Sequence, residues 1–152
     1  MKPDVHDNQL LYENREKYVG LFSGVFSAKQ TYIAKSSGRF NQEIVGESHY
    51  QRQLKKLCGG YSKDGSRVEA DALLVPEDKN RHDKNAVRIE VAGKIVGYLS
   101  RQDAKYFRRK VKKTEAAEKN VTCKALIVGG KKLGLFERSN FGVWLDLDMD
   151  DI

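Results

Sequence analysis

The sequence predicts a mainly β protein of the α+β class, in which at least six strands and two helices form a small closed barrel. Apolar and polar residues alternate in short segments such as residues 67–75 and 86–91, which is the period of a strand with one buried face. Apolar residues recur at helical spacing in residues 49–58 and 101–113. This number of strands, with a non-local strand order, suits a closed barrel better than a doubly wound sheet.

The central element is a hairpin that leads directly into a helix. Residues 86–91 alternate between apolar and charged side chains, and residues 94–99 return antiparallel after a two-residue turn that ends at Gly93. Ser100 follows as an N-cap residue, and Asp103 stands three positions later, where a carboxylate accepts hydrogen bonds from the first helical turn. A polar, charged loop precedes this unit.

The chain divides into an N-terminal extension at residues 1–40, a core at 41–148 and an acidic tail at 149–152. The extension is polar and contains two further strand patterns, at residues 18–26 and 30–34. The core strands are predicted at residues 43–46, 67–75, 86–91, 94–99, 121–128, 133–136 and 142–147. Gly59 and Gly60 are expected to end the first helix.

The charge pattern favours a polyanionic partner. The formal net charge is +7, and setting aside four aspartates crowded near the end (Asp146, Asp148, Asp150 and Asp151) leaves +11 on the rest. The helix at residues 101–113 carries seven basic residues and one acidic residue. Such an excess favours phosphate contacts, although a solvated helix face explains the same pattern without any ligand.

Several classes of function are excluded by missing motifs. The chain has no apolar run of membrane-spanning length and no signal-peptide core at its start, so we expect a cytoplasmic protein with no membrane partner. It has no GxxxxGK[ST] phosphate loop, HExxH motif or nucleophile elbow, so we expect no enzymatic activity and no cofactor. Cys58 and Cys123 stand in apolar surroundings without a CxxC partner and are expected to be buried free thiols.

Three blocks of sequence resemble the HIRAN domain family. They are IVGESHYQ at residues 44–51, ALLVPEDKNRHDKNAV at 72–87 and GKIVGYLSRQDA at 93–104, in the order and spacing of that family. The resemblance implies an OB-like barrel of six strands with two helices. It also implies DNA binding, which in the best-understood members is directed at the 3′ end of a single strand.

The resemblance also implies a set of DNA-contacting residues. Asn80, Asp83, Tyr98 and Arg101 fall where the family lines its groove. The full candidate set is Ser48, His49, Tyr50, Asn80, His82, Asp83, Lys84, Tyr98, Arg101, Lys105, Arg108 and Arg109. Its aromatic and histidine rings would stack on bases, and its basic side chains would neutralise phosphates.

Asp83 has two interpretations in this set. Its carboxylate repels phosphate but accepts a hydrogen bond from a terminal hydroxyl, so it can distinguish a 3′-OH from a continuing strand. Alternatively, it only stabilises the loop through an Asx turn before Asn85.

The chain differs from the DNA-end binders of the family at three groove positions. It has Ser48 where they have arginine, and His49 and His82 where they have tyrosine. Histidine still stacks on a base, and serine donates to phosphate without adding charge. These histidines with Asp83 also form a two-histidine, one-carboxylate set of the kind that holds a metal ion, although we predict no metal site.

The alternative function is that of a protein-interaction adaptor. In this interpretation residues 1–40 or the acidic tail dock on a helicase, a nuclease or an antiviral-defence enzyme, and the barrel serves as scaffold. The two functions are compatible, because a free-standing DNA-binding domain must deliver its ligand to another protein.

Overall fold

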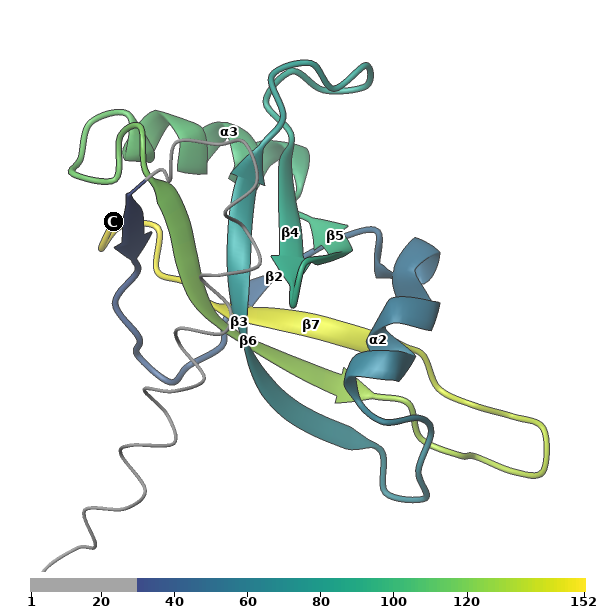
Figure 1. The fold of residues 1–152 in the computed structure, drawn as a ribbon. Coiled ribbons are helices and arrows are strands. Elements are labelled where there is room, and N and C mark those ends of the chain that lie inside the picture. Colours follow the sequence, from purple (N-terminus) through teal and green to yellow (C-terminus); the bar gives the residue numbers. More distant parts are fainter. Residues whose placement is uncertain (1–29) are drawn as a thin grey trace, which may run out of the picture. The chain divides into compact units, whose positions relative to one another are not determined.

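A single curled β-sheet dominates the computed structural model, which describes residues 30–152 (Figure 1). Its strands within this range are β1 (Thr31–Ile33), β2 (Gln42–Glu43), β3 (Ser66–Pro76), β4 (Val87–Val91), β5 (Lys94–Tyr98), β6 (Asn120–Gly129) and β7 (Phe141–Asp146). The strand order is β2-β7-β6-β3-β4-β5, with every neighbouring pair antiparallel, and β1 pairs parallel with β6. The expected mainly β, OB-like fold is confirmed. The expected strand at residues 18–26 lies outside the described residues.

The two ends of the sheet meet just after β2. Val45 N donates to Tyr98 O at 2.8 Å, and Tyr98 N donates to Val45 O at 2.9 Å. A Cβ atom on Gly97 would lie 2.8 Å from Val45 O and 2.7 Å from Ile44 Cδ1, so this approach requires a glycine. Because a single bridge joins the ends, the predicted closed barrel is a half-barrel with one point of closure.

The core lies on the inner face of the curled sheet and follows the period of two that the sequence predicts. Val87, Ile89 and Val91 of β4 are at most 1% exposed, and the residues between them are half-buried. Leu54 and Phe107 bring the two helices onto the same core, and each is at most 1% exposed. Burial of these side chains is the main source of stability.

Two helical segments connect the strands. A 3₁₀ turn, η2 (Glu47–Tyr50), leads into α2 (Gln51–Leu57), so the predicted first helix begins as a 3₁₀ turn. The second helix, α3 (Arg101–Val111), begins at the predicted cap. Ser100 Oγ accepts from Asp103 N at 3.1 Å and donates to Asp103 Oδ2 at 2.7 Å.

The predicted strand at residues 133–136 is wrong. These residues belong to the β6–β7 loop (residues 130–140), in which Leu133 N donates to Glu137 O at 2.9 Å instead of pairing with a neighbouring strand. Leu135 and Phe136 are 87% and 90% exposed. Apolar residues alternate with glycine in this segment, but no neighbouring strand within residues 30–152 pairs with it, and alternation alone does not make a strand.

Asp146 lies in the predicted last strand and differs from the acidic side chains that follow it in sequence. It ends β7, is 1% exposed and accepts four hydrogen bonds from the segment that follows β1. The donors are Ser36 Oγ at 2.6 Å, Ser37 N at 2.9 Å, Ser37 Oγ at 2.7 Å and Gly38 N at 2.8 Å. This carboxylate therefore ties the segment to β7, while the division of the chain at residues 40 and 148 stays a prediction.

The two cysteines are free thiols, as expected. Cys123 is buried, and burial raises its pKa to about 12, while Cys58 is half-buried. No helix among residues 30–152 is long and apolar enough to cross a membrane.

We predict that Asp146→Asn destabilises the protein by about 2–3 kcal/mol at neutral pH, because it removes charge-assisted hydrogen bonds and turns an amide group towards donors. Burial raises the pKa of Asp146, but the hydrogen bonds from Ser36, Ser37 and Gly38 outweigh it and hold that pKa well below its usual range. This contribution is therefore present above about pH 4 and is lost as the pH falls towards the lowered pKa. Thermal unfolding from pH 7 downwards should show the two proteins converging.

The control for this prediction is Asp71→Asn, which removes an exposed carboxylate paired with Lys124 at 2.7 Å. Exposed pairs contribute under about 1 kcal/mol, so this change should barely move the melting temperature. Equal stability of Asp146→Asn and wild type at neutral pH would contradict the role assigned to Asp146.

Candidate nucleic-acid interface

The β3–β4 loop (residues 77–85) is held by an ion-pair network at its base. Arg88 on β4 donates to Glu77 Oε1 at 2.5 Å and, through Nε, to Glu90 Oε1 at 2.8 Å. Glu77 then accepts from Asn80 Nδ2 at 2.7 Å through its other oxygen. These groups are only about one-fifth exposed, so their hydrogen bonds are stronger than those of a surface pair. The sheet thereby orients Asn80.

Asn80 and Asp83 in turn fold the tip of this loop. Asn80 Oδ1 accepts from the backbone N atoms of His82, at 2.9 Å, and Asp83, at 3.1 Å. Asp83 Oδ1 accepts from Asn85 N at 2.8 Å, which is the Asx turn considered from the sequence. The second carboxylate oxygen of Asp83, Oδ2, has no hydrogen-bond partner within residues 30–152. The turn therefore occupies one oxygen and leaves the other available to a ligand.

An aromatic group stands beside the point of sheet closure. The rings of Tyr50 and Tyr98 lie 6.5 Å apart at 42°, and the His49 ring lies 6.5 Å from Tyr50 at 77°. Burial, with smaller contributions from the neighbouring Tyr50 hydroxyl and Glu77 carboxylate, raises the pKa of Tyr98 to about 12. The Tyr98 hydroxyl thus stays protonated at neutral pH. Tyr98 pairs across the sheet with Arg88, which bonds to Glu77 at the base of the β3–β4 loop, so the aromatic group lies next to this loop.

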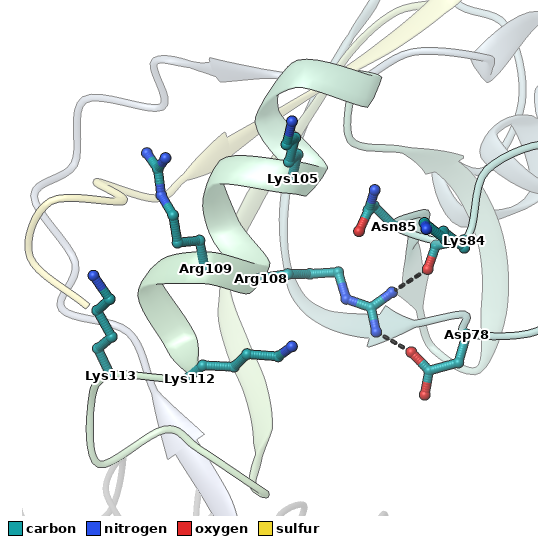
Figure 2. A pocket seen from close by; sticks show the side chains of 8 residues that line it. All are labelled: Asp78, Lys84, Asn85, Lys105, Arg108, Arg109, Lys112 and Lys113. Atoms are coloured by element: carbon teal, nitrogen blue, oxygen red, sulfur yellow. Dashed lines mark hydrogen bonds and ion pairs between the residues drawn. The ribbon is translucent and has the colours of Figure 1, made fainter.

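A basic hollow of about 550 Å³ lies between α3 and the β3–β4 loop (Figure 2). It is lined by Asp78, Lys84, Asn85, Lys105, Arg108, Arg109, Lys112 and Lys113. Arg108 crosses from the helix to the loop, where it donates to Lys84 O at 2.7 Å and pairs with Asp78. Six basic side chains thus surround the hollow, and one of them joins its two walls.

The C-terminal residues contact the adjoining face of α3. Tyr106 Oη donates to Asp150 Oδ1, and Lys110 Nζ lies 3.5 Å from the same carboxylate oxygen. The hydrogen bond from Tyr106 lowers the pKa of Asp150, and Lys110 contributes to that shift. Arg109 lies over the Tyr106 ring, 5.1 Å from its centroid. Of the basic residues on α3, Arg108 and Lys110 are therefore engaged by protein carboxylates.

The structure distributes the twelve predicted contact residues over three neighbouring places. They are Ser48, His49, Tyr50 and Tyr98 at η2 and β5; Asn80, His82, Asp83 and Lys84 in the β3–β4 loop; and Arg101, Lys105, Arg108 and Arg109 on α3. Ser48, His49 and His82 are exposed, as are Arg101 and Lys105. Their contacts with DNA stay a prediction.

The sequence interpretation missed the residues that hold the loop. Glu77 and Arg88 were not singled out, although Arg88 and Glu90 share the outer face of β4 and Glu77 follows the end of the paired strand β3. That alternation of charges on neighbouring strands was the available signal. Within residues 30–152 no three His, Cys, Asp or Glu side chains gather as metal ligands, so the set of His49, His82 and Asp83 is not assembled.

The fold and this site define a small OB-like β-domain with a basic, aromatic-lined surface. The sequence model of the HIRAN domain matches residues 37–148, and the chain belongs to this family, which is known for binding DNA at the 3′ ends of single strands. No curated protein and no solved structure matches the chain.

We predict that Glu77→Ala loosens the β3–β4 loop without unfolding the sheet. Losing a charge-assisted hydrogen bond costs about 1.5–3 kcal/mol locally, so the amide protons of His82 and Asp83 should exchange at least about tenfold faster. Hydrogen exchange followed by NMR measures this effect. Lys79→Ala, at an exposed position in the same loop, is the matched control and should leave both rates unchanged. Unaltered exchange in Glu77→Ala would show that the network does not order the loop.

Proposed function

We propose that this protein is a non-enzymatic DNA-binding module that favours single-stranded DNA or 3′ ends. The observation that carries the proposal is that a basic hollow and an aromatic group adjoin the same loop, the β3–β4 loop. Aromatic rings stack on bases and cations neutralise phosphates, and the β3–β4 loop adjoins both the aromatic group and the hollow. Membership of a DNA-binding family supports the same conclusion.

In this proposal the aromatic rings at the closure of the sheet stack on the bases. Tyr50 and Tyr98 form a tilted pair, and His49 stands edge-on to Tyr50, so an unstacked base has aromatic surface on which to lie. His82 is exposed in the loop and provides a further ring. Stacking is tolerant of sequence because every base has a π face.

In this proposal the basic side chains around the hollow neutralise the phosphates. Lys84, Lys105 and Arg109 are exposed there, and Arg101 is exposed at the start of α3. Arg108 has a different part in this proposal, because its ion pair with Asp78 keeps the loop against the helix.

The end of the strand is recognised by Asp83 in this proposal. Its Oδ1 holds the Asx turn, and its Oδ2 accepts a hydrogen bond from a terminal 3′-OH. A 3′-phosphate brought to the same place would be repelled by the carboxylate. The loop-stabilising role and the recognition role are therefore compatible.

We predict that Asp83→Asn abolishes the preference for a free 3′-OH over a 3′-phosphate. Asparagine keeps the acceptor that holds the Asx turn but lacks the charge that repels phosphate. Fluorescence anisotropy at two salt concentrations should compare a single strand ending in 3′-OH, the same strand ending in 3′-phosphate, and a blunt duplex. Asp83→Ala, which also removes the turn, should weaken binding to both single strands.

Discrimination by Asp83→Asn equal to that of the wild type would sink end recognition by the carboxylate. Equal, salt-dependent binding of all three oligonucleotides to the wild type would indicate a general DNA surface. No binding by the wild type would favour the adaptor function instead.

We predict that the double variant Lys105→Ala/Arg109→Ala weakens binding to every single strand and lowers the slope of log K against log salt by about 1.4. Each phosphate contact to a single strand contributes about 0.7 to that slope. The salt titration of anisotropy measures the change. Lys94→Ala/Lys124→Ala, at exposed positions on β5 and β6, is the matched control. A slope equal to that of the control variant would rule out phosphate contacts by Lys105 and Arg109.

In the cell we propose a role in DNA repair, processing or defence, in the cytoplasm and together with a helicase, nuclease or defence enzyme. A binding domain that does not itself catalyse a reaction acts through another protein, which supports this part of the proposal. Direct binding assays with candidate enzymes, with and without a 3′-OH oligonucleotide, would test whether DNA and partner bind together.

A further inference from the structure

The β6–β7 loop (residues 130–140) presents large apolar side chains to solvent. Leu133 is 58% exposed, Leu135 87% and Phe136 90%. The loop projects beyond the end of the sheet, next to the segment that connects α2 with β3 (Figure 1). Scattered exposed apolar residues are ordinary, but three within four positions at the tip of one loop form a local apolar surface.

The geometry of this tip is held by its own hydrogen bonds. Leu133 N donates to Glu137 O at 2.9 Å, and Ser139 N donates to Lys131 O at 2.9 Å. Lys132 N donates to Ser62 O at 2.8 Å, which anchors the loop to the segment after α2. The tip is therefore presented in a defined orientation, and a ligand need not order it first.

The base of the loop joins a basic surface that reaches back along α2. Tyr61 stacks on Phe141 with centroids 5.3 Å apart, and the cations of Lys55 and Arg138 lie 5.1 and 5.3 Å from its ring centroid. Residues 51–65 and 130–140 together carry seven basic and two acidic side chains. Because α2 follows directly on η2, and Ser62 after it contacts Gly130 and Lys132, these basic residues lie along the chain between the aromatic group and the loop.

Charge and size decide which partner suits this surface. A stable protein interface buries about 800 Å² on each partner, far more than three side chains on a narrow loop provide. A cationic path that ends in a small apolar wedge suits DNA, where Phe and Leu side chains insert against base steps while lysine and arginine hold the phosphates.

We propose that the β6–β7 loop is a second DNA-contacting element, in which Leu135 and Phe136 pack against the first base pair of a duplex adjoining the bound single strand. The proposal rests on the proposed function, because it places the single-stranded end on the aromatic group and in the basic hollow. The protein then reads a junction: a 3′ overhang in the groove and the edge of the duplex at the loop.

The test uses two DNAs and the full chain. One is a single strand of about six nucleotides, within the site size of one OB-type barrel, and the other is a hairpin duplex carrying that strand as a 3′ overhang. Wild type should bind the overhang duplex more tightly. Leu135→Ser/Phe136→Ser should bind it about tenfold more weakly while binding the short strand as wild type does. The fluorescence of 2-aminopurine in the terminal base pair should change on binding wild type but not on binding the variant.

The matched control is Ile33→Ser, which removes an apolar side chain that is 63% exposed. Ile33 pairs with Thr122, seven residues before Gly129, so it stands about 23 Å along β6 from the start of the loop. Thermal unfolding should be unchanged in both variants, because the altered side chains are exposed.

Equal affinity of the loop variant and wild type for the overhang duplex would overturn the proposal, as would equal losses on both DNAs. Loss of binding to phosphatidylserine vesicles with DNA binding intact would assign the tip to a membrane surface and overturn it as well. Failure of wild type to bind the short strand would instead overturn the proposed function, and the loop proposal with it.

Discussion

Two backbone hydrogen bonds between Val45 and Tyr98 are the contact on which the candidate site depends. They join the ends of the curled sheet, and Gly97 permits the approach because any Cβ there would collide with Ile44 and Val45. The chain passes directly from this bridge into η2, so closure sets Tyr50 beside Tyr98. Without these hydrogen bonds, Tyr50 and Tyr98 would lie on two segments that are not held together at this point.

Carboxylates organise the loops of this basic protein. Asp146 ties the segment after β1 to β7, Glu77 fixes the β3–β4 loop, and Asp78 holds that loop against α3 through Arg108. Asp150 engages Tyr106 and Lys110 on the same helix. These four acidic side chains therefore each have protein partners. The basic side chains around the hollow outnumber the carboxylates there and keep a net positive field, which attracts phosphate. Net charge alone does not reveal this division of roles.

Local chemistry made much of the fold predictable. The alternating strand at residues 86–91, its glycine turn and the Ser100 cap were correct because each depends on neighbours within a few residues. The predicted strand at residues 133–136 failed because pairing needs a second strand, and the segment closes on itself through Leu133 and Glu137. The hydrogen bonds of Asp146 could not be predicted for a related reason: their donors lie more than a hundred residues away in sequence.

The sequence by itself determined the strand and helix pattern, the basic character of α3 and the family blocks, because these are written in residue types at short spacing. Tertiary structure alone decided which cations pair with carboxylates, that Glu77 and Arg88 orient the loop carrying Asp83, and that Leu135 and Phe136 face solvent. The physical reason is that ion pairs and burial arise between segments distant in the chain. Their geometry follows from how the sheet curls and closes.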